Sequence, residues 1–222
     1  MSLNLWTLGN IKTKIRYLIG AKNDKSFTNI MLLNYINRYY TLIFPLEVQP
    51  LELQTWFSFD TVDGTDEYNL WSQTDTTSGQ TFEDGYLTLS KPITADGYNV
   101  RLWMNPEEFY AKWPAITTYE ESRPQDVLYY DQSLIFRAPP DDAYTMYFAS
   151  IKKPESLSDD TDYPTQEEWG PTIASGASLE ALEDMQNSER AAEVMQIHER
   201  NKNILMRKVH NQYSEYRSIP SF

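Results

Sequence analysis

The spacing of the apolar residues changes twice along this chain, and the change restricts the folds that it can adopt. Steps of three and four, typical of amphipathic helices, are confined to residues 7–45 and 164–217. Between these segments the spacing falls to two, the period of half-buried strands. The sequence therefore predicts an α+β protein. Residues 1–50 and 164–222 are expected to form one helical bundle, and residues 51–163 an antiparallel β module inserted into it.

The C-terminal segment contains the longest helix that the sequence predicts. A first helical pattern runs from Gln166 to Gln186, and a second runs from an N-cap at Ser188 to about Arg217. About thirty residues at 1.5 Å each make a rod of roughly 45 Å. Because one small domain cannot cover such a rod, we expect part of it to pack on another subunit. Its apolar face consists of Ala191, Val194, His198, Leu205, Val209, Tyr213 and Tyr216.

Two shorter helices are predicted near the N-terminus. The first has Thr7 as its N-cap and Gly20 at its left-handed C-terminal position. The second begins at Ser26 or Thr28 and ends just before Pro45. The apolar face of the first helix is Leu8, Ile11, Ile15 and Leu18, and that of the second is Ile30, Leu33, Ile36, Tyr40 and Ile43. The basic residues Lys12, Lys14, Arg16 and Arg38 lie off these faces and are expected to be solvated.

The middle of the chain contains seven or eight strand candidates separated by turn signals. A helical turn over residues 105–112 is capped by Asn105, and residues 155–164 form an acidic connector. The predicted strands span residues 54–60, 65–70, 81–83, 86–90, 98–104, 126–130, 133–137 and 144–152.

The net charge of −13 is unevenly distributed. Residues 51–170 carry 23 acidic and seven basic side chains. A segment this acidic is a poor candidate for binding a phosphate backbone. It is either an ordinary solvated surface or a surface that lets nucleic acid pass without adhering.

The sequence contains no constellation of residues that is typical of catalysis or of metal binding. His198 and His210 lie more than three helical turns apart, so they cannot share a metal ion within one helix. The glutamate pairs at 107–108, 120–121 and 167–168 are more typical of first helical turns than of an acid and base pair. Residues 159–162 lack the glycine and distal glutamate of a calcium loop, which favours a solvated linker. We therefore predict no enzyme activity, no cofactor and no metal site.

Neither a membrane span nor a secretory signal is predicted. No run of about eighteen apolar residues occurs, and no basic segment followed by an apolar one begins the sequence. Cysteine is absent, which excludes disulfides and thiolate metal sites and agrees with a reducing compartment.

A series of short motifs follows the two N-terminal helices. The segment 59–70, FDTVDGTDEYNL, combines a phenylalanine, a Thr-x-x-Gly turn and a Tyr-x-Leu strand, and Arg123-Pro124 comes later. The segment 136–144, FRAPPDDAY, then precedes residues 153–157, KPESL, and a proline before the final helices. In this order the motifs resemble the head-to-tail adaptor proteins of tailed bacteriophages. Trp71 departs from the pattern, which has proline after Tyr-x-Leu.

This resemblance implies a structural protein of the virion neck, assembled in the host cytoplasm. Proteins of this kind form a homo-oligomeric ring, usually twelve-fold, between the portal protein and the tail or nozzle protein. Double-stranded DNA passes through the central channel without specific binding. Such adaptors often hold the portal with their C-terminal segment, which makes portal-binding candidates of the following residues: Arg207, Lys208, Tyr213, Tyr216, Ile219 and Phe222. A frayed end is the alternative reading of this segment.

The residues alone leave two other functions open. A β module rich in aromatic and acidic side chains is also compatible with a tail component that binds or cleaves carbohydrate. That function leaves the long terminal helices unexplained. A tail or baseplate component with the same plan but a different neighbour is the other alternative.

Overall fold

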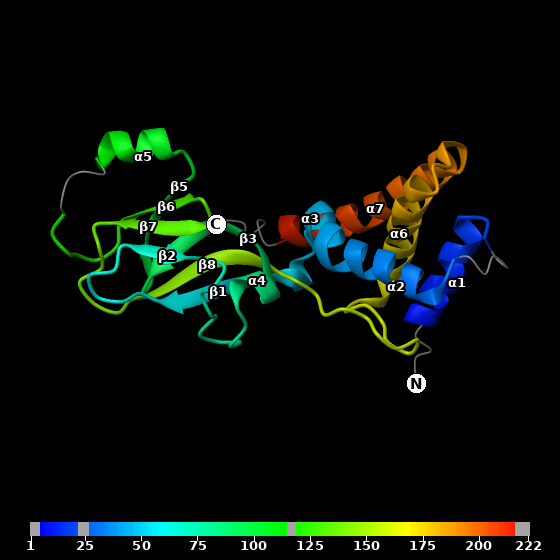
Figure 1. The fold of residues 1–222 in the computed structure, drawn as a ribbon, viewed down its shortest axis with the longest axis horizontal. Coiled ribbons are helices and arrows are strands. Elements are labelled where there is room, and N and C mark those ends of the chain that lie inside the picture. Colours follow the sequence, from blue (N-terminus) through cyan, green and yellow to red (C-terminus); the bar gives the residue numbers. More distant parts are fainter. Residues whose placement is uncertain (1–4, 22–26, 115–118, 216–222) are drawn as a thin grey trace, which may run out of the picture. The chain divides into compact units, whose positions relative to one another are not determined.

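The computed structural model describes residues 5–21, 27–114 and 119–215, and it contains two compact units. One unit consists of Met1–Leu53 and Pro154–Phe222, so both ends of the chain contribute to it. The other consists of Gln54–Lys153. The first is helical and the second contains the strands, which confirms the α+β class (Figure 1).

The N-terminal part of the helical unit contains α1 (Leu8–Leu18) and α2 (Asn29–Arg38). Both helices begin at the predicted caps, because the hydroxyls of Thr7 and Thr28 accept hydrogen bonds from backbone N–H groups three residues later. A π-helical turn, η1 (Tyr39–Ile43), follows α2 and leads directly into α3 (Phe44–Val48). The helical path therefore continues past Pro45, where the sequence predicts an end. Pro45 is tolerated because it occupies the first turn of α3, where no N–H donor is needed.

The buried face of α2 and η1 differs from the predicted one. Ile36 and Tyr40 are buried as expected, but Ile30 is 71% exposed. The predicted apolar face and the face that is buried both contain Ile36 and Tyr40, so helical spacing alone does not distinguish them. The packing of α2 against α6 decides which of the two faces is buried. The buried apolar positions of α2, η1 and the start of α3 are Leu32, Ile36, Tyr39, Tyr40 and Phe44.

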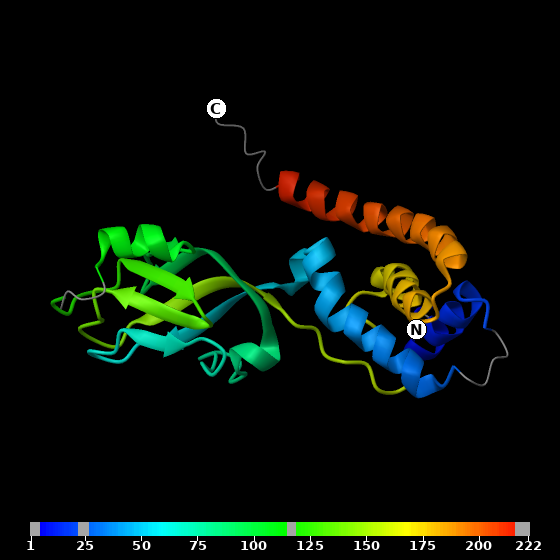
Figure 2. The same cartoon turned by 45° about the horizontal axis from the view of Figure 1, so that its top comes forward.

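The C-terminal part of this unit contains η3 (Glu167–Trp169), α6 (Gly170–Asp184) and α7 (Ser188–Glu215). Helix α6 is central, since α1, α2 and α7 all pack against it (Figure 2). Two of its glycines permit close approach of aromatic rings. A Cβ on Gly170 would lie 2.4 Å from Trp6, and one on Gly176 would lie 2.2 Å from Tyr39.

Helix α7 starts after the predicted break, but its cap differs from the prediction. The side chain of Asn187, not that of Ser188, accepts a hydrogen bond from the backbone N–H of Arg190, at 3.1 Å. Along the predicted face Val194, His198 and Leu205 are buried, whereas Ala191 and Val209 are half-buried. The side chains of Tyr213 and Tyr216 lie outside the described residues.

The acidic connector is hydrogen-bonded to the start of α1, while residues 159–161 remain exposed, as the prediction of a solvated linker requires. The backbone N–H groups of Leu8 and Gly9 donate to the carbonyls of Asp162 and Asp160, at 2.7 and 3.1 Å. Lys12 Nζ lies 2.7 Å from a carboxylate oxygen of Asp160. The first N–H groups of a helix have no partner within it, and the connector supplies these acceptors.

The β unit contains two four-stranded sheets with the strand orders β1-β8-β3-β4 and β2-β7-β6-β5. A short 3₁₀ turn, η2 (Leu51–Leu53), leads into the first strand. Most pairs are antiparallel, but β5 and β6 are parallel, so the prediction of a wholly antiparallel module is wrong at that pair. A parallel pair needs a crossover, and α5 (Pro106–Lys112) lies in this one, capped by Asn105 as predicted. The strands are β1 (Gln54–Asp60), β2 (Glu67–Asn69), β3 (Tyr86–Ala95), β4 (Tyr98–Asn99), β5 (Arg101–Trp103), β6 (Asp126–Tyr130), β7 (Ser133–Arg137) and β8 (Thr145–Lys152).

One predicted strand is a helical turn instead. Residues 81–83 belong to α4 (Phe82–Gly85) and its cap, because the Thr81 hydroxyl accepts from the N–H of Asp84 and donates to the Asp84 carboxylate.

The core of the β unit joins both sheets around aromatic rings. Phe59 of β1 stacks on Phe148 of β8 with ring centroids 5.8 Å apart, and it also contacts Phe136 of β7.

Candidate functional site

The described residues contain no group of three histidine, aspartate or glutamate side chains that could hold a metal ion. Glu107 and Glu108 occupy the exposed first turn of α5, as the sequence predicts. Across the same residues, no helix has both the length and the apolar composition needed to cross a membrane. The candidate sites are therefore surfaces and grooves.

The structure describes part of the predicted portal-binding set. Arg207 and Lys208 are exposed on α7, and Lys208 forms an ion pair with Glu168 of η3. Lys208 is thus attached to the start of α6 within the same chain. Tyr213 lies on α7 with its side chain undescribed, and Tyr216, Ile219 and Phe222 lie outside the described residues.

Helix α7 also exposes apolar side chains that the sequence analysis missed. Met195 and Met206 are 44% and 42% exposed, and Ile204 is exposed on the other flank of the buried face. Met195 and Met206 are eleven positions apart, about three helical turns, so they lie on the same side of the helix. This separation of about three turns is the sequence signal that could have identified Met195 and Met206 as an exposed apolar surface. This surface is available for a partner that the helical unit does not supply.

His198 attaches α7 to the rest of the helical unit. Its ring is 3% exposed, with Nε2 3.4 Å from the Tyr39 hydroxyl and Nδ1 3.2 Å from the Ser175 hydroxyl. Tyr39 in turn donates a hydrogen bond to Glu47 at 2.9 Å. Burial lowers the pKa of His198, and the nearby Glu47 opposes this effect. His198 is therefore a buried residue that joins α7 to the helical core.

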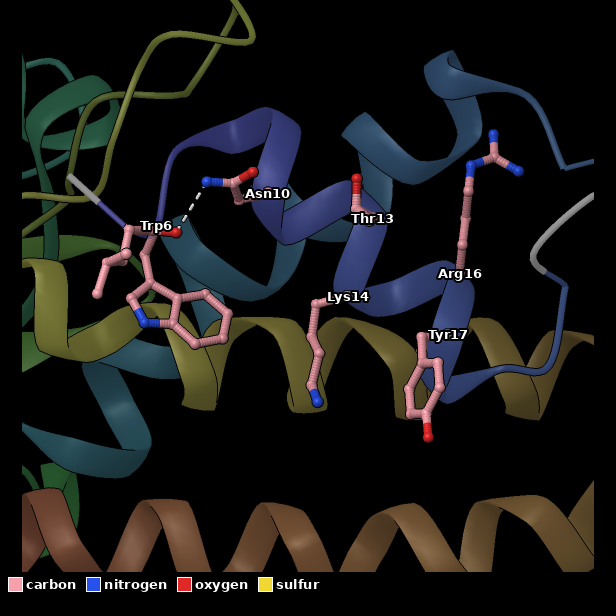
Figure 3. A pocket seen from close by; sticks show the side chains of 7 residues that line it. Trp6, Asn10, Thr13, Lys14, Arg16 and Tyr17 are labelled. Carbon is pink, nitrogen blue, oxygen red and sulfur yellow. Dashed lines mark hydrogen bonds between the residues drawn. The ribbon is translucent and has the colours of Figure 1, made fainter. Parts of the chain in front are cut away.

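A groove of about 750 Å³ runs along α1, and Trp6, Lys14 and Tyr17 extend from it on the side of α7 (Figure 3). Trp6 packs on Gly170 at one end of the groove, and Lys14 Nζ lies 5.3 Å from the ring centroid of Tyr17 at the other. We call this surface the α1 groove, and its lining residues are Leu5, Trp6, Asn10, Thr13, Lys14, Arg16 and Tyr17. The sequence predicts ordinary solvated faces for Lys14 and Arg16, since nothing local places Trp6 beside them.

A second groove, of about 510 Å³, lies in the β unit beside Trp56, Tyr86 and Tyr147. Among its described lining residues Asp75 is the one carboxylate. Burial raises the pKa of Asp75, but hydrogen bonds from Ser78 and Ser58 outweigh burial and hold it below its usual value. Glycoside hydrolysis generally uses two carboxyl groups, one of them able to supply a proton. This groove does not provide such a pair.

The helical unit exposes apolar side chains on α7 and around α1, and the β unit is acidic, which are features suited to a structural protein that binds partners. The model of the SU10 adaptor protein family matches residues 6–217, and the chain belongs to that family. The match confirms the resemblance to phage head-to-tail adaptors. Membership implies a structural component of the bacteriophage virion neck that interacts with portal and tail components. No curated protein sequence matches the chain.

Proposed function

We propose that this chain is the subunit of a head-to-tail adaptor ring, twelve-fold as in proteins that it resembles, which joins the portal to the tail and surrounds the passing DNA. The helices from both chain ends act as the bundle that assembles the ring. The observation that carries the proposal beyond family membership is the concentration of negative charge in the β unit.

The charge of the β unit suits a channel through which DNA moves. Residues 54–153 carry sixteen acidic and seven basic side chains, a net charge of −9. Two of the basic side chains, Lys112 and Arg137, are already paired with Asp126 and Asp66 at 2.7 and 2.6 Å. Acidic groups repel phosphates within a Debye length of roughly 8–10 Å. An acidic wall therefore keeps a moving duplex from adhering.

The C-terminal segment is the proposed portal contact. Arg207 and Lys208 lead into it, and Met195 and Met206 extend an exposed apolar surface along the preceding part of α7. A large apolar side chain contributes about 1.5–3 kcal/mol when a partner buries it. Because a ring repeats each contact, modest contacts suffice to hold the assembled portal and adaptor together.

Negative-stain electron microscopy of the chain, alone and mixed with the portal protein of the same virus, tests the ring. We expect rings or rings seated on portals. Deleting residues 212–222 should weaken portal association, while circular dichroism shows that the remaining helices stay folded. If the truncated chain still binds the portal as tightly as the full chain, the portal contact lies elsewhere.

Binding of duplex DNA tests the acidic wall. At physiological salt we expect weak binding or none, measured by fluorescence anisotropy with labelled duplexes. A sub-micromolar Kd that weakens steeply with salt would show that the surface exposed to DNA is basic.

A further inference from the structure

The α1 groove contains a cation, Lys14, for which the described part of the chain supplies no acidic partner. Among the described residues no carboxylate pairs with Lys14, whereas Lys12 on the same helix is bonded to Asp160. Leu5 and Tyr17, which line the same groove, are 70% and 52% exposed. An exposed cation among large apolar side chains matches a partner surface that is both acidic and apolar.

A surface of this kind exists where α2 packs on α6. Glu180, Glu183 and Asp184 are close enough to interact electrostatically, and we call them the acidic corner. Burial raises the pKa of Glu180, and its two acidic neighbours raise it further, although Arg38 Nε lies 3.7 Å from its carboxylate. Across the described residues, Arg38 is the one basic side chain that forms an ion pair with any of the three carboxylates of the acidic corner.

Apolar side chains of α2 adjoin the acidic corner. The Tyr35 hydroxyl donates to Asp184 at 2.6 Å, which places this part of α2 beside the corner. Met31 lies one turn before Tyr35 on the same helix face and is partly exposed. The corner thus combines carboxylates with an accessible apolar side chain, which complements the cation and the apolar side chains of the α1 groove.

The two surfaces occupy different sides of the helical unit. Trp6, Lys14 and Tyr17 extend from α1 on the side of α7 (Figure 3), whereas the acidic corner is contacted by α2. Two complementary surfaces on different sides of one subunit form a head-to-tail contact, and repetition of such a contact closes a ring when the rotation permits.

We infer that the α1 groove binds the acidic corner of a second copy of this chain, with Lys14 meeting the carboxylates of Glu183 and Asp184. This inference rests on the proposed ring and names the contact that builds it. A second copy is favoured over the portal as the occupant. A single contact between two copies would pair Lys14 with the carboxylates of the acidic corner, for which Arg38 is the one basic partner among the described residues.

Charge reversal on each surface tests the contact. Lys14→Glu and Glu183→Lys each place like charges across every interface, and neither removes an ion pair or a hydrogen bond seen among the described residues. Each single variant should reduce the ring fraction at least about tenfold, because like charges facing each other oppose association. Sedimentation velocity and negative-stain images, with and without portal, measure that fraction.

Recombining the two changes makes the test specific. In an equimolar mixture of the two variants, alternating subunits bring the acidic groove of Lys14→Glu against the basic side chain that Glu183→Lys introduces. The other interfaces of that ring join an unchanged groove to an unchanged corner. Rings should therefore return in the mixture, and also in the chain that carries both changes. The matched controls Lys91→Glu and Glu52→Lys make the same charge changes outside both surfaces and should leave the rings intact.

The outcomes separate this contact from the proposed function. Rings formed by both single variants would overturn the contact and leave the adaptor ring standing. A wild-type chain that forms no ring, even on the portal, would overturn both. Loss of portal binding with intact rings in Lys14→Glu would assign the groove to the portal and overturn the inference. Failure of the mixture to restore rings would show that the two surfaces do not meet, and Asp184→Lys repeats the test at the neighbouring carboxylate.

Discussion

Replacing Gly176 by alanine tests whether α6 is packed at contact distance against Tyr39. A Cβ on Gly176 would lie 2.2 Å from Tyr39 Cζ, far inside van der Waals contact. The ring is not free to move aside, because its hydroxyl donates to Glu47 at 2.9 Å and its edge contacts the ring of His198. The substitution should therefore displace a buried aromatic side chain and its hydrogen bond together.

The expected loss is about 1.5–5 kcal/mol in the free energy of unfolding of the helical unit. Overpacking a close-packed site costs about 1–3 kcal/mol. Weakening the hydrogen bond between Tyr39 and the Glu47 carboxylate costs about 1.5–3 kcal/mol, since the acceptor is charged. The higher helix propensity of alanine returns about 1 kcal/mol, so the net effect stays destabilising.

Urea unfolding followed by far-ultraviolet circular dichroism measures this loss. Among the described α-helices only α4 and α5 lie outside the helical unit, so the signal reports mainly on that unit. The control is the same substitution in a Tyr39→Ala background, where the clash is absent. There Gly176→Ala should be neutral or stabilise by up to about 1 kcal/mol. An equal loss in both backgrounds would refute the packing explanation.

Two further predictions concern buried polar groups. The helical unit should lose stability as the pH falls from about 7 to 5, because burial lowers the pKa of His198 against the opposing effect of Glu47, so the unfolded chain binds a proton that the folded chain excludes. His198→Gln should flatten this dependence in urea midpoints measured at successive pH values, and an unchanged slope would assign it to other groups. Asp75→Ala should destabilise the β unit by about 2–4 kcal/mol, because the N–H groups of Ser58 and Ser78 lose their acceptor. Tryptophan fluorescence during urea unfolding measures this change, and an unchanged midpoint would show that the Asp75 hydrogen bonds do not stabilise the unit.

The elements that could be predicted are those specified by neighbouring residues. Thr7, Thr28 and Asn105 cap helices through hydrogen bonds to N–H groups two or three positions later, so the signal is local. Asp131 and Gln132 both have positive φ, as a type I′ turn requires, and they connect β6 to β7, the strands predicted at 126–130 and 133–137. His198 belongs to the helical stripe that is buried in the structure.

The features that could not be predicted depend on distant parts of the chain. Thr81 is a cap, yet three residues are too few to distinguish a helical turn from a strand. The parallel pairing of β5 with β6 depends on the crossover that contains α5. The α1 groove depends on Gly170, which lets Trp6 pack against α6 from a position more than 160 residues away in the sequence. The proposed portal residues remain a prediction from the sequence.

The pairing of β1 with β8 has a consequence for the order in which the protein folds during synthesis. Gln54 pairs with Ile151, so the folded β unit brings its own two ends onto neighbouring strands. The ribosome completes this contiguous unit before it makes α6 and α7. Joining the two halves of the helical unit across about 100 unstructured residues would cost about 4 kcal/mol in loop-closure entropy. A β unit that has already folded removes most of that cost, so α6 emerges from the ribosome when α1 and α2 are already held nearby.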